Sequence, residues 1–207
     1  MPAPIRPSAG SKSAPRRRFL PEVLTEAELR SLLAAVGGPP ASKARNRALI
    51  AFLYRSGLRI AEALALRPKD VDTSACSVRV LFAKGGGART VGIDPGALAF
   101  LSEWVVHRDR IAGLPADAPL FCSASGRAVT TAYVRRLLPE LGRRAGIAKR
   151  VHAHGLRHTH AAELRSEGVD IGIISKQLGH RSILTTIRYL DHIAPTAVIE
   201  AVAKRVW

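Results

Sequence analysis

The sequence is short of cysteines, long apolar runs and acidic side chains, and each shortage excludes a class of protein. Its two cysteines, Cys76 and Cys122, are far apart and in no metal-ligand spacing, which favours reduced thiols over a disulfide framework. No segment approaches the roughly 20 apolar residues of a membrane span, and the first residues lack the apolar run of a signal peptide. We therefore expect a cytoplasmic protein without membrane contact.

The shortage of acids leaves a large positive charge. Against 16 Asp and Glu residues stand 32 Lys and Arg, a formal net charge of +16. Such an excess favours a polyanionic partner, nucleic acid before an anionic membrane. Aromatic residues make up only 5% of a chain that is 47% hydrophobic, so we expect a core of Leu, Ile, Val and Ala.

Residues 1–21 are predicted to form a disordered basic arm, because they are rich in Pro, Ser and Ala. Their charged residues are all basic: Arg6, Lys12, Arg16, Arg17 and Arg18. The arm is either a solvated tail or a segment that follows DNA phosphates, and the sequence leaves both interpretations open.

From Thr25 onward the patterning predicts a mainly helical domain. Thr25 to Glu28 form a capping box, and Asp94-Pro95 is an N-cap followed by proline at the first helical position. Further helices are expected from about 42 to 56, at 59–66, after Thr130 with an interruption or kink at Pro139, and at 155–167, 170–178, 182–190 and 196–206.

The segment 77–93 departs from the helical pattern. Val78, Val80 and Phe82 occupy alternate positions, three glycines follow at 85–87, and extended character resumes at Thr90-Val91. This pattern is typical of a β-hairpin with a flexible tip. The expected fold class is mainly α with a small antiparallel β-sheet (α+β).

Six of the seven histidines lie between 152 and 192, which raises a zinc hypothesis. His154 and His158 have the i, i+4 spacing that zinc can use on a helix. The intervening residues include Arg157 and no glutamate, and an arginine is unfavourable beside a dication. A guanidinium suits a phosphate better, because it is planar and stays charged. We expect no metal and no cofactor.

Four segments resemble, in the same order, the boxes of tyrosine recombinases (the phage integrase family). SGLRIAEALAL at 56–66 is similar to the box with their first active-site arginine, and Lys84 is similar to their hairpin lysine. HGLRHTHAAEL at 154–164 resembles their H-x-x-R-H motif, and LGHRSILTTIRY at 178–189 resembles their LGH…Y segment. The resemblance covers about residues 22–195 and implies the catalytic-domain fold of that family.

The resemblance implies a nucleophile and two cations acting on a DNA phosphodiester. Tyr189 would attack the phosphorus and form a 3′-phosphotyrosyl link. Arg59 and Arg157 would stabilise the negative charge that develops on the non-bridging oxygens. Glu62, one helical turn after Arg59, is expected to hold that arginine in place and to take no part in the chemistry.

The resemblance also implies the groups that move protons. His154 would act as general base, and His180 would hydrogen-bond the phosphate or the tyrosine. Lys84 would be the general acid, giving its proton to the leaving 5′ oxygen. Because the covalent step preserves the energy of the phosphodiester, the scheme requires neither ATP nor metal.

The expected function is site-specific DNA recombination of the integrase or invertase type. The expected partners are double-stranded DNA, further copies of the chain, up to a tetramer in the synapse, and accessory DNA-bending proteins. Two alternatives remain open: a type IB topoisomerase or telomere resolvase, which uses the same chemistry, and a catalytically idle DNA-binding accessory protein.

The chain departs from the family at both ends. Only residues 1–21 precede the catalytic-type domain at 22–195, where most members have a helical core-binding domain. The sequence therefore resembles either a short member that consists of the catalytic domain alone or a truncated piece of a longer member. Residues 196–207 are expected to form a C-terminal helix that packs either on its own domain or on a neighbouring subunit.

Overall fold

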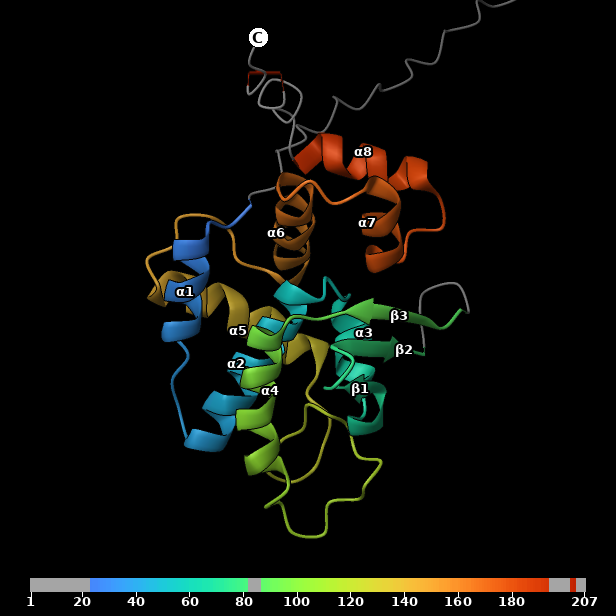
Figure 1. Ribbon diagram of the computed structural model, residues 1–207. Coiled ribbons are helices and arrows are strands. Elements are labelled where there is room, and N and C mark those ends of the chain that lie inside the picture. The colour runs from blue at the N-terminus through green and yellow to red at the C-terminus, as the bar shows by residue number, and fades with distance from the viewer. Residues whose placement is uncertain (1–22, 82–86, 194–201, 204–207) are drawn as a thin grey trace, which may run out of the picture.

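The computed structural model describes residues 23–81, 87–193 and 202–203 of the chain. Within these ranges the fold is mainly helical with one small antiparallel sheet, which confirms the expected class (Figure 1). Its elements are α1 Glu26–Ala34, α2 Pro40–Arg55, α3 Ile60–Ala65, η1 Pro68–Asp70, β1 Val71–Asp72, β2 Ser77–Val80, β3 Arg89–Gly92, α4 Pro95–Arg108, α5 Thr131–Arg144, α6 Ala153–Ser166, α7 Ile171–Leu178 and α8 Ile183–Ile193.

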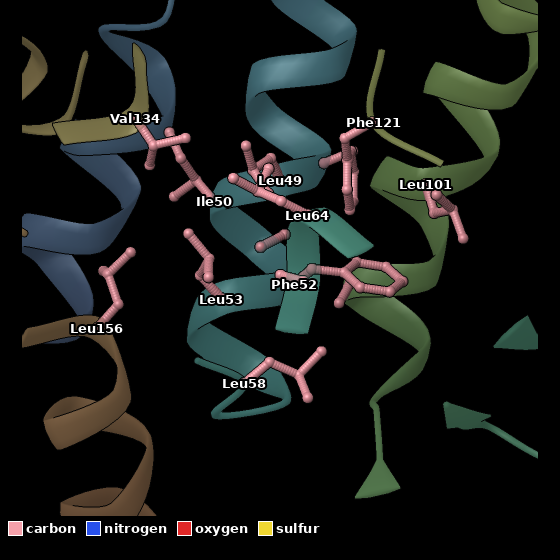
Figure 2. Close-up of a cluster of buried hydrophobic side chains, with 14 of the residues drawn as sticks. Leu49, Ile50, Phe52, Leu53, Leu58, Leu64, Leu101, Phe121, Val134 and Leu156 are labelled. Atoms are coloured by element: carbon pink, nitrogen blue, oxygen red, sulfur yellow. The ribbon is translucent and has the colours of Figure 1, made fainter. Parts of the chain in front are cut away.

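Helix α2 is the centre of the main core. Leu49, Ile50, Phe52 and Leu53 on this helix are at most 1% exposed. Figure 2 shows Phe52 on the side of Leu101 of α4, and Ile50 and Leu53 on the side of Val134 of α5 and Leu156 of α6. Burial on all faces fixes α2 in space, and with it the segment that follows its last residue and leads to Arg59.

The turn after α2 depends on Gly57. Its φ angle is +63°, in the left-handed region that favours glycine. A Cβ atom at this position would lie 2.6 Å from Cδ2 of His160 on α6. The chain therefore passes directly against α6 here, which brings Arg59 at the start of α3 close to the residues of α6.

The predicted hairpin is confirmed by β2 and β3, which pair antiparallel with Val78 opposite Val91, both buried. β1 pairs with the other edge of β2 and was not predicted. Two residues are too few to produce an alternating pattern. β1 is stabilised by its pairing with the edge of β2. The hairpin tip, including Lys84, lies outside the described residues.

A second, smaller apolar cluster holds α6, α7 and α8 together at one end of the molecule (Figure 1). Its buried members come from all three helices, and the ring of Tyr189 packs against them. This cluster docks α8 onto α6 and α7. The buried members are Ala161, Ile174, Leu178, Leu190 and Ile193.

Three expectations for the helices need correction or concern residues that are not described. Of the interruption or kink predicted at Pro139, the interruption is wrong, because α5 runs through this residue, and the kink stays a prediction. The buried Leu138 and Leu141 beside it show how packing offsets one absent hydrogen bond. α2 begins at Pro40, two residues before the predicted start. The helix predicted at 196–206 lies outside the described residues except for Val202 and Ala203, which are helical.

None of the helices in the described part of the chain has the length and apolar character of a membrane-spanning segment.

Candidate active site

Arg59 and Glu62 form the pair that the sequence predicts. Arg59 precedes α3, and its Nη1 donates to Oε1 of Glu62 at 2.9 Å while its backbone N–H donates to Oε2 at 2.9 Å. The Glu62 side chain is only 3% exposed, whereas that of Arg59 is 34% exposed. Burial acts to raise the pKa of Glu62, but hydrogen bonds from Arg89 and from the Arg59 backbone lower it to about 2. Glu62 is therefore ionised at neutral pH.

Arg157 on α6 is a buried cation, only 2% exposed, whose hydrogen-bond partners are neutral. Nη1 donates to the carbonyl of Gly57 at 2.6 Å, and Nη2 donates to the carbonyl of Leu178 at 2.6 Å. Within the described residues no carboxylate forms an ion pair with it. Burial, and then the charge of Arg59, lower its pKa to about 10. A buried cation without a carboxylate is costly unless an anion binds there, so this guanidinium favours a phosphate.

His180 follows α7, whose last turn ends at the left-handed Gly179. Its Nε2 lies 3.3 Å from Nη2 of Arg157, and its Nδ1 lies 2.9 Å from Oγ1 of Thr186. A guanidinium only donates, so Nε2 is the acceptor and Nδ1 carries the proton toward Thr186. Burial, and then the charge of Arg157, lower the pKa of His180 to about 4. The ring is therefore neutral at physiological pH.

The Tyr189 ring on α8 lies among three histidines. It stacks on His158 at a centroid distance of 4.9 Å and 24° between planes, and it meets His180 at 5.3 Å and His154 at 6.3 Å edge to face. Its hydroxyl is buried and lies close to the Arg157 guanidinium, but no well-formed hydrogen bond to it is present among the described residues. Burial raises its pKa to about 12, against the lowering effect of Arg157. An unmade hydrogen bond in a buried place is costly, so this hydroxyl is available to a group that enters the site.

His154 lies in the first turn of α6, exposed at the edge of the site. Partial desolvation, followed by the charge of Arg157, lowers its pKa. Its ring meets that of His158 at 4.3 Å. A neutral, accessible imidazole beside a tyrosine can accept the phenolic proton.

A hollow of about 400 Å³ opens beside His154, between α5 and the start of α6. Arg135 and Arg150 line it together with His152 and with the apolar Leu138 and Pro139. Its charged lining residues are both arginines, which suits an anionic polymer entering the site.

The structure brings together five of the six predicted site residues: Arg59, Arg157, His154, His180 and Tyr189. The sixth, Lys84, lies outside the described residues. Their chemical roles remain predictions. In the part of the chain that the structure describes, no group of three or more His, Cys, Asp or Glu side chains could hold a metal ion.

Sequence reasoning missed three residues of the site. His158 was weighed as a zinc ligand and is the last residue of the HGLRH segment, but no role at the tyrosine was assigned to it; the structure stacks its ring on that of Tyr189. Thr186 gave no signal beyond its position within the LGH…Y segment. Arg89, which donates to Glu62, lies on a strand whose pattern predicts only extended structure.

Comparison with known proteins gives consistent matches. The model of the phage integrase family matches residues 22–194. Tyrosine recombinase XerC of Halalkalibacterium halodurans is 35% identical over 177 residues, which are 82% of this chain and 57% of the relative. Tyrosine recombinase XerD of Mycobacterium leprae is 36% identical over 199 residues, 92% of this chain and 61% of the relative. The chain thus spans less than two thirds of the length of these relatives.

Solved structures give the same result. A crystal structure of XerA recombinase superposes with a TM-score of 0.77 at 29% identity, covering 94% of this chain and 68% of that one. XerH site-specific recombinase, bound to a palindromic difH substrate after cleavage, superposes with a TM-score of 0.74 at 30% identity, covering 90% of this chain and 54% of that one. The described fold is therefore also the fold of part of these recombinases.

Proposed function

Because the chain belongs to the phage integrase family of tyrosine recombinases, we propose that it cleaves and rejoins double-stranded DNA at specific sites through a 3′-phosphotyrosyl intermediate. The observation that carries this proposal is the buried Tyr189 hydroxyl, unpartnered among the described residues and close to the uncompensated charge of Arg157. The relatives named above are recombinases, and XerH is bound to a DNA substrate. This favours recombination over relaxation by a topoisomerase or an idle accessory role.

In this mechanism Arg59 and Arg157 bind the scissile phosphate from two sides. Attack on the phosphorus increases the negative charge on the non-bridging oxygens, and the two guanidiniums stabilise that charge. Each preorganised donor of this kind contributes about 3–4 kcal/mol to lowering a barrier. His180 keeps the Arg157 guanidinium in place, because its Nε2 accepts from Nη2.

Two proton transfers accompany the exchange of bonds. The Tyr189 oxygen bonds to phosphorus while its proton passes to His154, and the bond from phosphorus to the 5′ oxygen breaks while Lys84 protonates that oxygen. Rejoining reverses these steps with the 5′-hydroxyl of another strand. The number of phosphodiester bonds is conserved, so the cycle consumes no nucleotide.

The proposal extends to the domains and the assembly. Residues 22–195 are the catalytic domain, and the basic arm at 1–21 lies on DNA phosphates. The basic hollow beside His154 admits the DNA backbone. Residues 196–207 dock on a neighbouring subunit in a tetramer that joins two DNA sites, with accessory DNA-bending proteins at the synapse.

Covalent capture on DNA tests the proposal. The target site is to be found with a pool of nicked duplexes of randomised sequence, since a nick near the cleavage point traps the covalent complex. We expect the unaltered chain to give a DNA-linked band on a denaturing gel and Tyr189→Phe to give none. Tyr133→Phe is the matched control, because the Tyr133 hydroxyl bonds Arg45 and Asn46 away from the site.

Two results would contradict this assignment. A linked band that persists in Tyr189→Phe would place the nucleophile elsewhere. Disappearance of the band in EDTA, reversed by zinc or magnesium, would show that the histidines bind a metal.

A further inference from the structure

Arg89 on β3 forms a buried two-pronged ion pair with Glu62. Its Nη1 donates to Oε1 and its Nη2 donates to Oε2, each at 2.9 Å. The Arg89 side chain is 13% exposed and that of Glu62 is 3% exposed. Such fork-to-fork pairs are the most directional that an arginine makes, because two parallel hydrogen bonds fix both planes.

The same carboxylate also holds Arg59, but by a single nitrogen of its guanidinium. Oε1 accepts from Nη1 of Arg59, and among the described residues this is the only hydrogen bond of that guanidinium. Because Arg89 takes the two-pronged position on Glu62, Arg59 cannot close a two-pronged pair with the same carboxylate. The remaining donors of Arg59 therefore face away from Glu62 and can bind an anion.

Arg89 also touches the turn that carries His180. A Cβ atom on Gly179 would lie 2.6 Å from Nε, 2.7 Å from Cζ and 2.9 Å from Cδ of Arg89. The stem of Arg89 thus occupies the space beside Gly179, whose φ of +66° also requires glycine. One side chain contacts both the carboxylate behind Arg59 and the backbone before His180.

The charges agree with this geometry. Glu62 carries one negative charge for two arginines, so the group of three keeps a net positive charge. The positive charge of Arg89 acts at the neighbouring groups, where it contributes to the lowered pKa values of His180 and Arg157.

We propose that Arg89 is a positioning residue for DNA cleavage, which holds Glu62 so that Arg59 presents its free donors to the scissile phosphate, and which fixes the turn before His180. The inference rests on the proposed function for its role in cleavage. The anion-binding geometry that it explains can be measured without DNA.

The first experiment needs no DNA and uses tungstate, a tetrahedral oxyanion, as the probe in calorimetry. We expect Arg89→Gln and Arg59→Gln to weaken tungstate binding by about tenfold each. The double variant should bind only slightly more weakly than Arg59→Gln alone, because Arg89 acts mainly through Arg59. Additive effects of the two substitutions, or unchanged binding in Arg89→Gln, would overturn the proposal.

The second experiment follows the rate of covalent capture on the selected DNA. Arg89→Gln should slow capture by about tenfold to a hundredfold, the range expected when a reacting group is displaced by about 1 Å, with little change in DNA affinity. As the pH is lowered, the capture rate of Arg89→Gln should begin to fall at a higher pH than that of the unaltered chain. The reason is that removal of the Arg89 charge raises the pKa of His180, which is then protonated earlier. Arg89→Lys keeps the charge but not the fork, so it should keep the pH profile and recover only part of the rate.

Arg67→Gln is the matched control, because Arg67 pairs with Asp117 at the surface. It should leave the capture rate unchanged. If Arg89→Gln captures DNA as fast as the unaltered chain at every pH, the inference is wrong and the proposed function stands. If the unaltered chain captures no DNA but the tungstate pattern holds, the proposed function is wrong and the role of Arg89 in shaping the anion site stands.

Discussion

Three histidines at or beside the candidate active site are kept neutral by their surroundings. His160 is 6% exposed and lies against the turn at Gly57, and burial followed by the charge of Arg55 lowers its pKa to about 4. His180 and His154 have lowered pKa values for the same two kinds of reason, burial and nearby arginines. A histidine that is neutral when folded but protonated when unfolded makes stability depend on pH.

The pH dependence of stability has a definite sign. Between about pH 6.5 and 4 the unfolded chain binds a proton at position 160 that the folded chain does not bind, so stability falls as the pH falls through this window. The shift corresponds to about 3 kcal/mol for His160. We expect His160→Leu to remove that part of the pH dependence, measured by urea unfolding at pH values from about 8 to about 4. At neutral and alkaline pH the histidines are neutral in both the folded and the unfolded state, so the stability measured there is the baseline. If the unaltered chain and His160→Leu lose stability equally on acidification, the lowered pKa of His160 is contradicted.

The sequence predicts those site residues that belong to a motif, and it misses those that act through tertiary contacts. Arg59, Arg157, His180 and Tyr189 stand in recognisable segments. Arg89 does not, because its role depends on Glu62, a residue 27 positions away in the sequence that only the folded chain brings within reach.

At the scale of elements, caps predicted the helix starts well. The side chains of Thr25, Asp94 and Thr130 each accept a backbone N–H at the expected helix start. Pro139 misled the prediction, because one absent N–H is a local defect that buried neighbours can offset. Edge strand β1 was missed since its stability comes from pairing with β2 and not from its own residues.

In the proposed mechanism, the connection between β2 and β3 supplies the proton of the leaving group. Lys84 falls in the connection between these strands, and we expect Lys84→Ala to slow cleavage far more than DNA binding. A 5′-bridging phosphorothioate releases a thiolate that needs little protonation, so this substrate should restore the rate of Lys84→Ala. Arg59→Ala is the comparison, and equal rescue of both variants would show that Lys84 is not the general acid.

For the whole molecule, the net charge of +16 is the property that we expect to set the affinity for DNA. The basic arm supplies part of that charge, and the slope of log K against log salt changes by about 0.9 for each DNA phosphate that a protein neutralises. We expect deletion of residues 1–18 to flatten that slope by roughly two to three, equally on specific and random DNA. The measurement is DNA affinity at several salt concentrations.

An arm with the same residues in a scrambled order is the control. Bonds to phosphates carry no sequence information, so the scrambled arm should keep the original slope. An unchanged slope after deletion would mean that the arm does not touch DNA.

The hydrogen bonds of Arg157 have a consequence for the choice of inactive variants. Its guanidinium bridges the carbonyls of Gly57 and Leu178, so it joins the segment after α2 to the end of α7. Replacing it removes the guanidinium that we propose binds the scissile phosphate. It also leaves two buried carbonyls unsatisfied, at about 1–3 kcal/mol each. A variant inactivated by replacing Arg157 therefore represents the native structure poorly in experiments that trap a DNA complex. Tyr189→Phe, which removes one unpartnered oxygen, preserves the architecture that a trapped complex is meant to reveal.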